Sequence, residues 1–150
     1  MIDRRLFLGL ATAATAFPSA LFGQVTKTEV SLMSFRMAFG GHSMTATLFD
    51  NPSARELMKM LPLDLTIEDY STNEKIAYLP RKLTQVTDTP FDNARPGDIA
   101  YYAPWGNLVF YYDSYRYSKG LIRLGRFDDG FEPLLTRGEF SLRIERACQR

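Results

Sequence analysis

The chain has 150 residues, which is enough for one domain with its own core and too few for two domains of ordinary size. It carries 18 basic and 17 acidic side chains, so it has no strong long-range field that would attract DNA, RNA or anionic lipid. The charge balance therefore weighs against nucleic-acid binding.

The first 23 residues have the pattern of an export signal. Arg4 and Arg5 precede a run of 17 nearly uncharged residues, Leu6 to Phe22, which is short for a membrane helix because crossing the bilayer takes about 20 apolar residues. We expect a cleaved signal and no stable membrane anchor, with cleavage after Gly23 or, by the A-x-A pattern, after Ala16. An uncleaved anchor and a general secretory signal remain alternatives.

The string "DRRLFLG" resembles the twin-arginine motif. That resemblance implies recognition by the twin-arginine export machinery and release of a folded, periplasmic or secreted bacterial protein. Residues 24–150 would then form the mature domain, in which 16 basic and 16 acidic side chains balance. The single cysteine, Cys148, is expected to be a free thiol because it has no partner in its own chain.

The mature chain begins with signals for a β-hairpin. Residues 29–37 and 43–49 alternate between apolar and polar side chains, which predicts two strands. Gly40 and Gly41 lie between the two runs and are suited to a tight turn.

A short helix is predicted next, within "DNPSARELMKMLP". Asn51 can serve as the N-cap, Pro52 suits the first helical position, and Pro62 follows the last turn. Apolar residues recur at helical spacing on one face, namely Ala54, Leu57, Met58 and Leu61. We expect this face to cover a sheet.

Most of the remaining chain also reads as β-structure. Residues 63–68 alternate, and further strands are predicted at 98–103, 107–113, 121–127 and 139–146, with turn residues between them. Residues 71–97 show no period and are either a functional loop or contain short structure. Seven or eight short strands with one short capping α-helix predict a mainly β fold, a small closed or nearly closed antiparallel β-barrel.

Several strings resemble the bacterial cyclophilin-like domain family: "TATLFDNPSARELMKMLPLDLTIEDY", "NEKIAYLP", "RPGDIAYYAP", "LVFYYDSY" and "IRLGRFDD". The resemblance covers roughly residues 30–147. It implies the cyclophilin barrel, a helix that caps it, and a cleft on one outer face. The sequence lacks the cyclophilin signature, in which a catalytic arginine precedes Pro-x-Phe, since Arg81 follows Pro80 here.

The residue inventory excludes several kinds of chemistry. His42 is the only histidine, so an imidazole-based zinc site is not expected. The chain has no Gly-x-Ser-x-Gly elbow, phosphate loop, dinucleotide fingerprint or EF-hand pattern. We predict neither a metal nor a cofactor, and no catalytic residue is assigned.

The segment 101–117, "YYAPWGNLVFYYDSYRY", contains eight aromatic rings. Strand alternation separates Leu108, Phe110 and Tyr112 from Val109 and Tyr111, so only part of the segment can form an outer surface. Of Tyr101 and Tyr102, one ring must face the core and one the outside. Trp105 lies in a turn, where an exposed indole suits the recognition of a proline or a flat group; folding back over the barrel end is the alternative.

The candidate ligand-binding residues are Glu74, Tyr78, Tyr101, Trp105, Tyr111 and Arg123. Glu74 is expected in the long loop, where it either contacts a ligand or holds the loop, and Arg123 is either a clamp for a carboxylate or carbonyl or a solvated side chain. Asp98 either caps the entry of its strand through backbone N–H groups or faces the cleft, and the cap is favoured.

The favoured function is a binding domain for a small molecule or an extended, proline-containing peptide. A peptidyl-prolyl isomerase with non-standard active-site residues is the alternative, because isomerisation needs little covalent chemistry.

Overall fold

A computed structural model describes residues 33–147 of the chain. The predicted signal at residues 1–23 and the free thiol of Cys148 lie outside the described residues. The elements are β1 (Ser34–Phe39), β2 (His42–Leu48), α1 (Pro52–Met60), β3 (Leu63–Tyr70), β4 (Glu74–Tyr78), β5 (Asp98–Tyr102), β6 (Asn107–Tyr111), β7 (Leu121–Phe127), the 3-10 helix η1 (Glu132–Leu135) and β8 (Phe140–Arg146).

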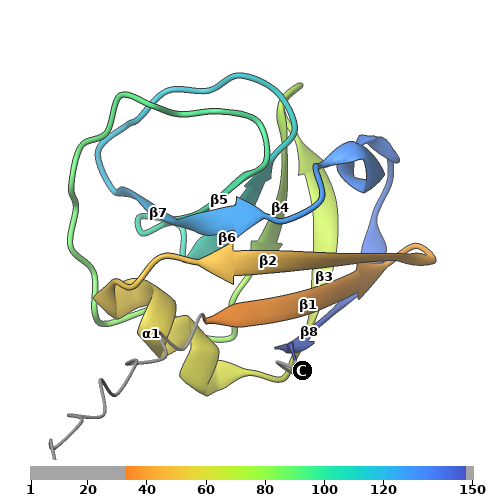
Figure 1. Cartoon of the computed structure of the whole chain (residues 1–150), viewed down its shortest axis with the longest axis horizontal. Helices are drawn as coiled ribbons and strands as arrows, with labels where there is room; N and C mark the ends of the chain where they lie inside the picture. Colours follow the sequence, from red (N-terminus) through yellow and green to blue (C-terminus); the bar gives the residue numbers. More distant parts are fainter. Residues whose placement is uncertain (1–32, 148–150) are drawn as a thin grey trace, which may run out of the picture. The chain divides into compact units, whose positions relative to one another are not determined.

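The strands close into an antiparallel barrel in the order β1-β2-β7-β5-β6-β4-β3-β8, with β8 paired to β1 (Figure 1). Closure gives each of these strands a hydrogen-bonded neighbour on both sides, so that their backbone groups are not left for edge-to-edge association. The predicted mainly β barrel with a single α-helix is confirmed for the described part of the chain.

The first hairpin follows from its sequence. Gly40 and Gly41 have positive φ angles of 53° and 79°, which match the twist of a two-residue hairpin turn, and Phe39 pairs with His42 across it. Strand alternation then places Phe35, Met37 and Phe39 in the core.

Helix α1 has the predicted ends. The Asn51 side chain accepts a hydrogen bond from the Ala54 N–H at 2.9 Å, and Pro52 occupies the first turn. The buried face of the helix, which includes Ala54 and Leu57, joins the main core of the barrel.

Strand β4 lies in the stretch 71–97, for which no period was predicted. The alternation is hidden because Lys75, a polar residue, points into the barrel. Its side chain is fully buried, and its Nζ donates to Asp69 Oδ1 at 2.8 Å. Glu74 therefore begins a strand, which corrects its predicted loop position.

The rest of that stretch, residues 79–97, is a long loop held by Glu56 of α1. The Glu56 carboxylate accepts hydrogen bonds from the N–H groups of Thr84 and Gln85, at 2.9 and 2.7 Å, and from Arg81 at 2.6 Å. Burial opposes ionisation of this carboxyl, but the hydrogen bonds outweigh that cost and lower its pKa from 4.5 to about 2.

Strand β6 is buried on both of its faces. On the inner face, Leu108 and Phe110 belong to the main core. On the outer face, Val109 and Tyr111 form a second, smaller cluster under the loop 112–120, as the alternation predicted. The 79–97 and 112–120 loops arch over the same side of the barrel (Figure 1), and Asp88 joins them by accepting a hydrogen bond from the Tyr117 hydroxyl.

Candidate functional site

A groove of about 250 Å³ lies on the outer surface of the barrel, along β6. We call it the aromatic groove. It is lined by Tyr70, Glu74, Ile76, Tyr102, Trp105, Asn107, Val109, Tyr111, Ser118 and Leu121. Asn107, Val109 and Tyr111 share one face of β6 because alternate residues of a strand point the same way. The groove therefore extends from the beginning of β6 to its end.

Tyr102 and Trp105 line the end of the groove near the turn between β5 and β6, and Tyr70, which is paired with Glu74 across β3 and β4, contacts Trp105 through its ring. The Trp105 ring meets Tyr70 at a centroid distance of 5.3 Å and Tyr102 at 5.5 Å, both edge to face. Trp105 and Tyr70 remain 44% and 42% exposed. Gly106 shapes the turn with a φ of 73°, a conformation that favours glycine. The result is a partly exposed aromatic wall held by ring contacts.

At the same end, Asn107 has an unpaired polar atom. The residue is 1% exposed, its Nδ2 donates to the Leu108 carbonyl at 3.1 Å, and its Oδ1 has no hydrogen-bond partner among the described residues. Because Nδ2 is engaged, the free atom is an acceptor. Buried acceptors are normally hydrogen-bonded, and leaving one unpaired costs about 1–3 kcal/mol, so this oxygen calls for a donor.

Glu74 lies at the opposite end of the groove, paired across the sheet with Tyr111. Partial burial raises the pKa of the Glu74 carboxyl, and a hydrogen bond from the Tyr111 hydroxyl opposes part of that rise. Burial and the nearby Glu74 charge in turn raise the pKa of Tyr111, so its hydroxyl remains a donor.

The Tyr111 side of the groove is held in place by the 112–120 loop. The ring of Tyr111 stacks on Tyr115 at a centroid distance of 3.5 Å, and the Tyr115 hydroxyl donates to Asp98 at 2.7 Å. Asp98 is fully buried and also accepts from Arg126 at 2.6 Å and from the Arg95 N–H at 3.1 Å. The predicted capping role of Asp98 is confirmed, and the same carboxylate anchors the 112–120 loop.

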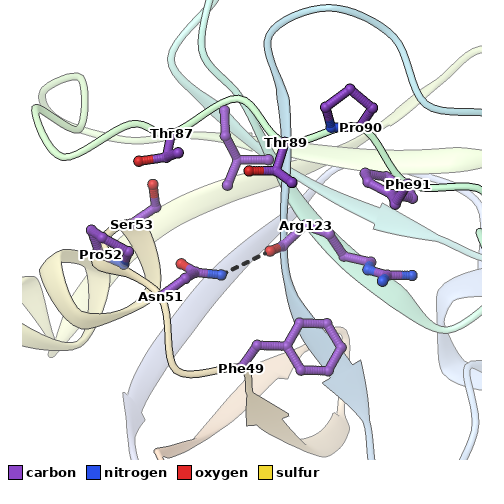
Figure 2. A pocket seen from close by; sticks show the side chains of 10 residues that line it. Phe49, Asn51, Pro52, Ser53, Thr87, Thr89, Pro90, Phe91 and Arg123 are labelled. Atoms are coloured by element: carbon purple, nitrogen blue, oxygen red, sulfur yellow. Dashed lines mark hydrogen bonds between the residues drawn. The ribbon is translucent and has the colours of Figure 1, made fainter.

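A second pocket, of about 410 Å³, lies between the start of α1 and the 79–97 loop (Figure 2). We call it the helix–loop pocket. It is lined by Phe49, Asn51, Pro52, Ser53, Thr87, Thr89, Pro90, Phe91, Ile122 and Arg123.

The principal polar groups of this pocket bond to the protein itself. Asn51 Nδ2 donates to the Arg123 carbonyl at 3.1 Å, the dashed line in Figure 2, and the Ser53 hydroxyl donates to the Gln85 carbonyl. The Arg123 guanidinium donates to Asn93 Oδ1 at 2.8 Å and lies 4.5 Å from the centroid of the Phe91 ring. These contacts fasten the loop to the barrel.

Three of the predicted ligand-binding residues, Glu74, Trp105 and Tyr111, come together in the aromatic groove. Tyr78 is 49% exposed at the end of β4 and does not line the groove. Arg123 lies in the helix–loop pocket.

Tyr101 faces the barrel interior, where it is fully buried and its hydroxyl accepts a hydrogen bond from the Leu83 N–H at 3.0 Å. Tyr102 is therefore the outward ring of that pair. Sequence reasoning also missed Tyr70 and Asn107. Asn107 was assigned to the start of a strand, but only the fold reveals that its oxygen lacks a partner.

The described residues contain no group of three or more histidine, cysteine or acidic side chains that could hold a metal ion. Within residues 33–147, no helix is long and apolar enough to cross a membrane.

The barrel, its short helix and a groove on its outer surface define an architecture of the cyclophilin kind. The model of the cyclophilin-like family matches residues 37–145, most of the chain, and the chain belongs to that family. The solution structure of the hypothetical protein AF2241 from Archaeoglobus fulgidus is similar in fold, with a TM-score of 0.59 and 18% identity over 77% of this chain and 95% of that one. No curated protein sequence matched the chain.

Proposed function

We propose that this cyclophilin-like domain binds a small molecule or one or two side chains of an extended peptide in the aromatic groove. The observation that carries the proposal is the unpaired Oδ1 of Asn107, a buried residue that lines a groove bordered by exposed aromatic rings. Ligand sites usually combine apolar walls with a few precisely placed polar groups, and this groove has both. Its volume of about 250 Å³ suits a small group better than a drug-sized molecule.

The test uses Trp105, the only tryptophan of the chain, as a reporter inside the groove. The full chain is titrated with small organic fragments of positive, zero and negative charge while its fluorescence is followed. We expect a saturable change with at least one class of fragment and a loss of affinity in Asn107→Ala. The matched variant Asn93→Ala, which removes a partner of Arg123 in the helix–loop pocket, should bind as the wild type does. If no fragment changes the fluorescence, the groove is not the binding site.

We also propose that the chain is exported by the twin-arginine route, on the basis of Arg4, Arg5 and the apolar run that follows them. Replacement of both arginines by lysine preserves the charge but removes the motif. The precursor should then stay in the cytoplasm of a bacterial host, as judged by fractionation, whereas normal export of the variant would contradict this route.

A further inference from the structure

The aromatic groove has negatively charged and hydrogen-bond acceptor groups but no positive charge among its lining residues. Its polar groups include the Glu74 carboxylate and the free Asn107 oxygen, and none of the residues that line it is positively charged. An anionic ligand would meet the carboxylate at one end and an acceptor at the other. A ligand with N–H donors and positive charge would complement both.

Glu74 differs from three other carboxylates that lie in buried settings. Asp98 contacts Arg126, Asp69 contacts Lys75, and Glu56 contacts Arg81, with N–O distances of 2.6 to 2.8 Å. Glu74, in contrast, has the Tyr111 hydroxyl as its hydrogen-bond partner and forms no ion pair within residues 33–147. A partly buried carboxylate without a counter-ion is a favourable position for an incoming cation.

The two ends of the groove are separated along β6. Glu74 is paired with Tyr111, whereas Asn107 lies four residues earlier on the strand, a backbone spacing of roughly 14 Å at about 3.4 Å per residue. Ile76 and Val109 lie between the ends and supply an apolar floor. At this backbone spacing a single ammonium group is too small to contact both residues, so a ligand that contacts both must be elongated.

From these features we infer that the aromatic groove binds an elongated ligand with an alkylammonium group at the Glu74 end and an N–H donor at the Asn107 end, joined by an apolar segment. The inference rests on the proposed binding function and specifies its ligand class. An ammonium group offers three donors to the carboxylate, and the faces of Tyr70, Tyr102 and Trp105 favour a cationic or N–H-bearing end over an anionic one. The same chemistry occurs in a free diamine and in a lysine side chain followed by its own backbone amide.

The experiment titrates the full chain with alkyl probes while the Trp105 fluorescence is recorded. Butylammonium, butanol and butyrate have similar lengths and differ in charge. Diaminobutane, diaminohexane and diaminooctane add a second ammonium at increasing distances. An acetylated and amidated tripeptide with a central lysine presents the ammonium on a peptide.

We expect butylammonium to bind about tenfold more tightly than butanol or butyrate, and one of the longer diamines to bind about tenfold more tightly than butylammonium. Glu74→Gln should weaken every ammonium probe about tenfold, whereas the matched charge change Glu139→Gln, at an exposed residue outside the groove, should have no effect. Asn107→Ala should remove only the additional affinity of the longer diamine. If that variant does not fold, the Glu74 pair and the probe series still decide the question.

Binding of butanol or butyrate as tightly as butylammonium, or unchanged ammonium affinity in Glu74→Gln, would overturn the inference while leaving a binding groove in place. If none of the probes changes the Trp105 fluorescence, the proposed binding function itself is contradicted. If the ammonium probes bind, comparison of the affinities for the diamine and the tripeptide shows whether the groove prefers a free diamine or a lysine side chain of a peptide.

Discussion

The helix–loop pocket and the aromatic groove differ in size and in what their polar groups do. The helix–loop pocket is the larger, at about 410 Å³ against about 250 Å³, yet Asn51, Ser53 and Arg123 are bonded to other parts of the chain. The aromatic groove is smaller, and its Asn107 oxygen has no partner among the described residues. Volume alone is therefore a poor guide to a binding site here, and unmet hydrogen-bonding capacity is the better one.

We therefore expect variants around the helix–loop pocket to lower stability and leave ligand binding unchanged. Variants of the aromatic groove should lower ligand affinity and leave stability nearly unchanged. The largest effect is expected for Glu56→Gln, on the helix whose start lines the helix–loop pocket. The amide cannot accept all the bonds that the carboxylate receives from Arg81, Thr84 and Gln85, so we expect a loss of about 3 kcal/mol in the free energy of unfolding. Urea denaturation measures it. An unchanged midpoint would show that the loop does not depend on Glu56.

Acidification should reduce the difference in unfolding free energy between the wild type and Glu56→Gln. The folded-state pKa of Glu56, about 2, is lower than its ordinary value of 4.5, so its ionisation stabilises the fold at pH values above 4.5. That contribution is lost progressively as the pH falls from about 4.5 towards 2. The gap in unfolding free energy between the wild type and Glu56→Gln should shrink across this range, and a gap independent of pH would contradict the assignment.

A smaller loss of stability, about 1–2 kcal/mol, is expected for Arg123→Ala. The variant removes the bonds to Asn93 and the contact with the Phe91 ring, and it leaves the closer partner of Asp98, Arg126, in place. Thermal unfolding measures the stability, and fragment titration should give wild-type affinity. A variant that lost ligand binding at full stability would make Arg123 a clamp and reverse the comparison of the two pockets.

The smallest effect on stability is expected for Glu74→Gln, within about 0.5 kcal/mol of the wild type. Glu74 is half-buried without an ion pair among the described residues, and burial already raises its pKa, so a neutral side chain costs little. Thermal unfolding at neutral pH checks this value. A loss as large as that of Glu56→Gln would mean that Glu74 holds the barrel together, as the other buried carboxylates do.

Much of the fold was predictable because local patterns specify local structure. The cap at Asn51 and the strand 121–127 agree with the structure, since capping chemistry and alternation act over a few residues. Strand β4 escaped prediction because Lys75 points inward, and its burial depends on Asp69 of the neighbouring strand. Alternation likewise separated Tyr101 from Tyr102 but could not say which ring faced outward.

The class of fold, the short capped helix and the two faces of the aromatic segment follow from residue types a few positions apart, so they could be predicted from the sequence. The strand order, in which β7 lies between β2 and β5, and β4 between β3 and β6, depends on contacts between distant segments and is known only from the folded structure. That closure brings Tyr70, Glu74 and Trp105 to one groove and leaves the Asn107 oxygen without a partner. Whether a polar atom finds a hydrogen-bond partner depends on the groups around it in space. Pairing between strands that are distant in the sequence determines which groups those are.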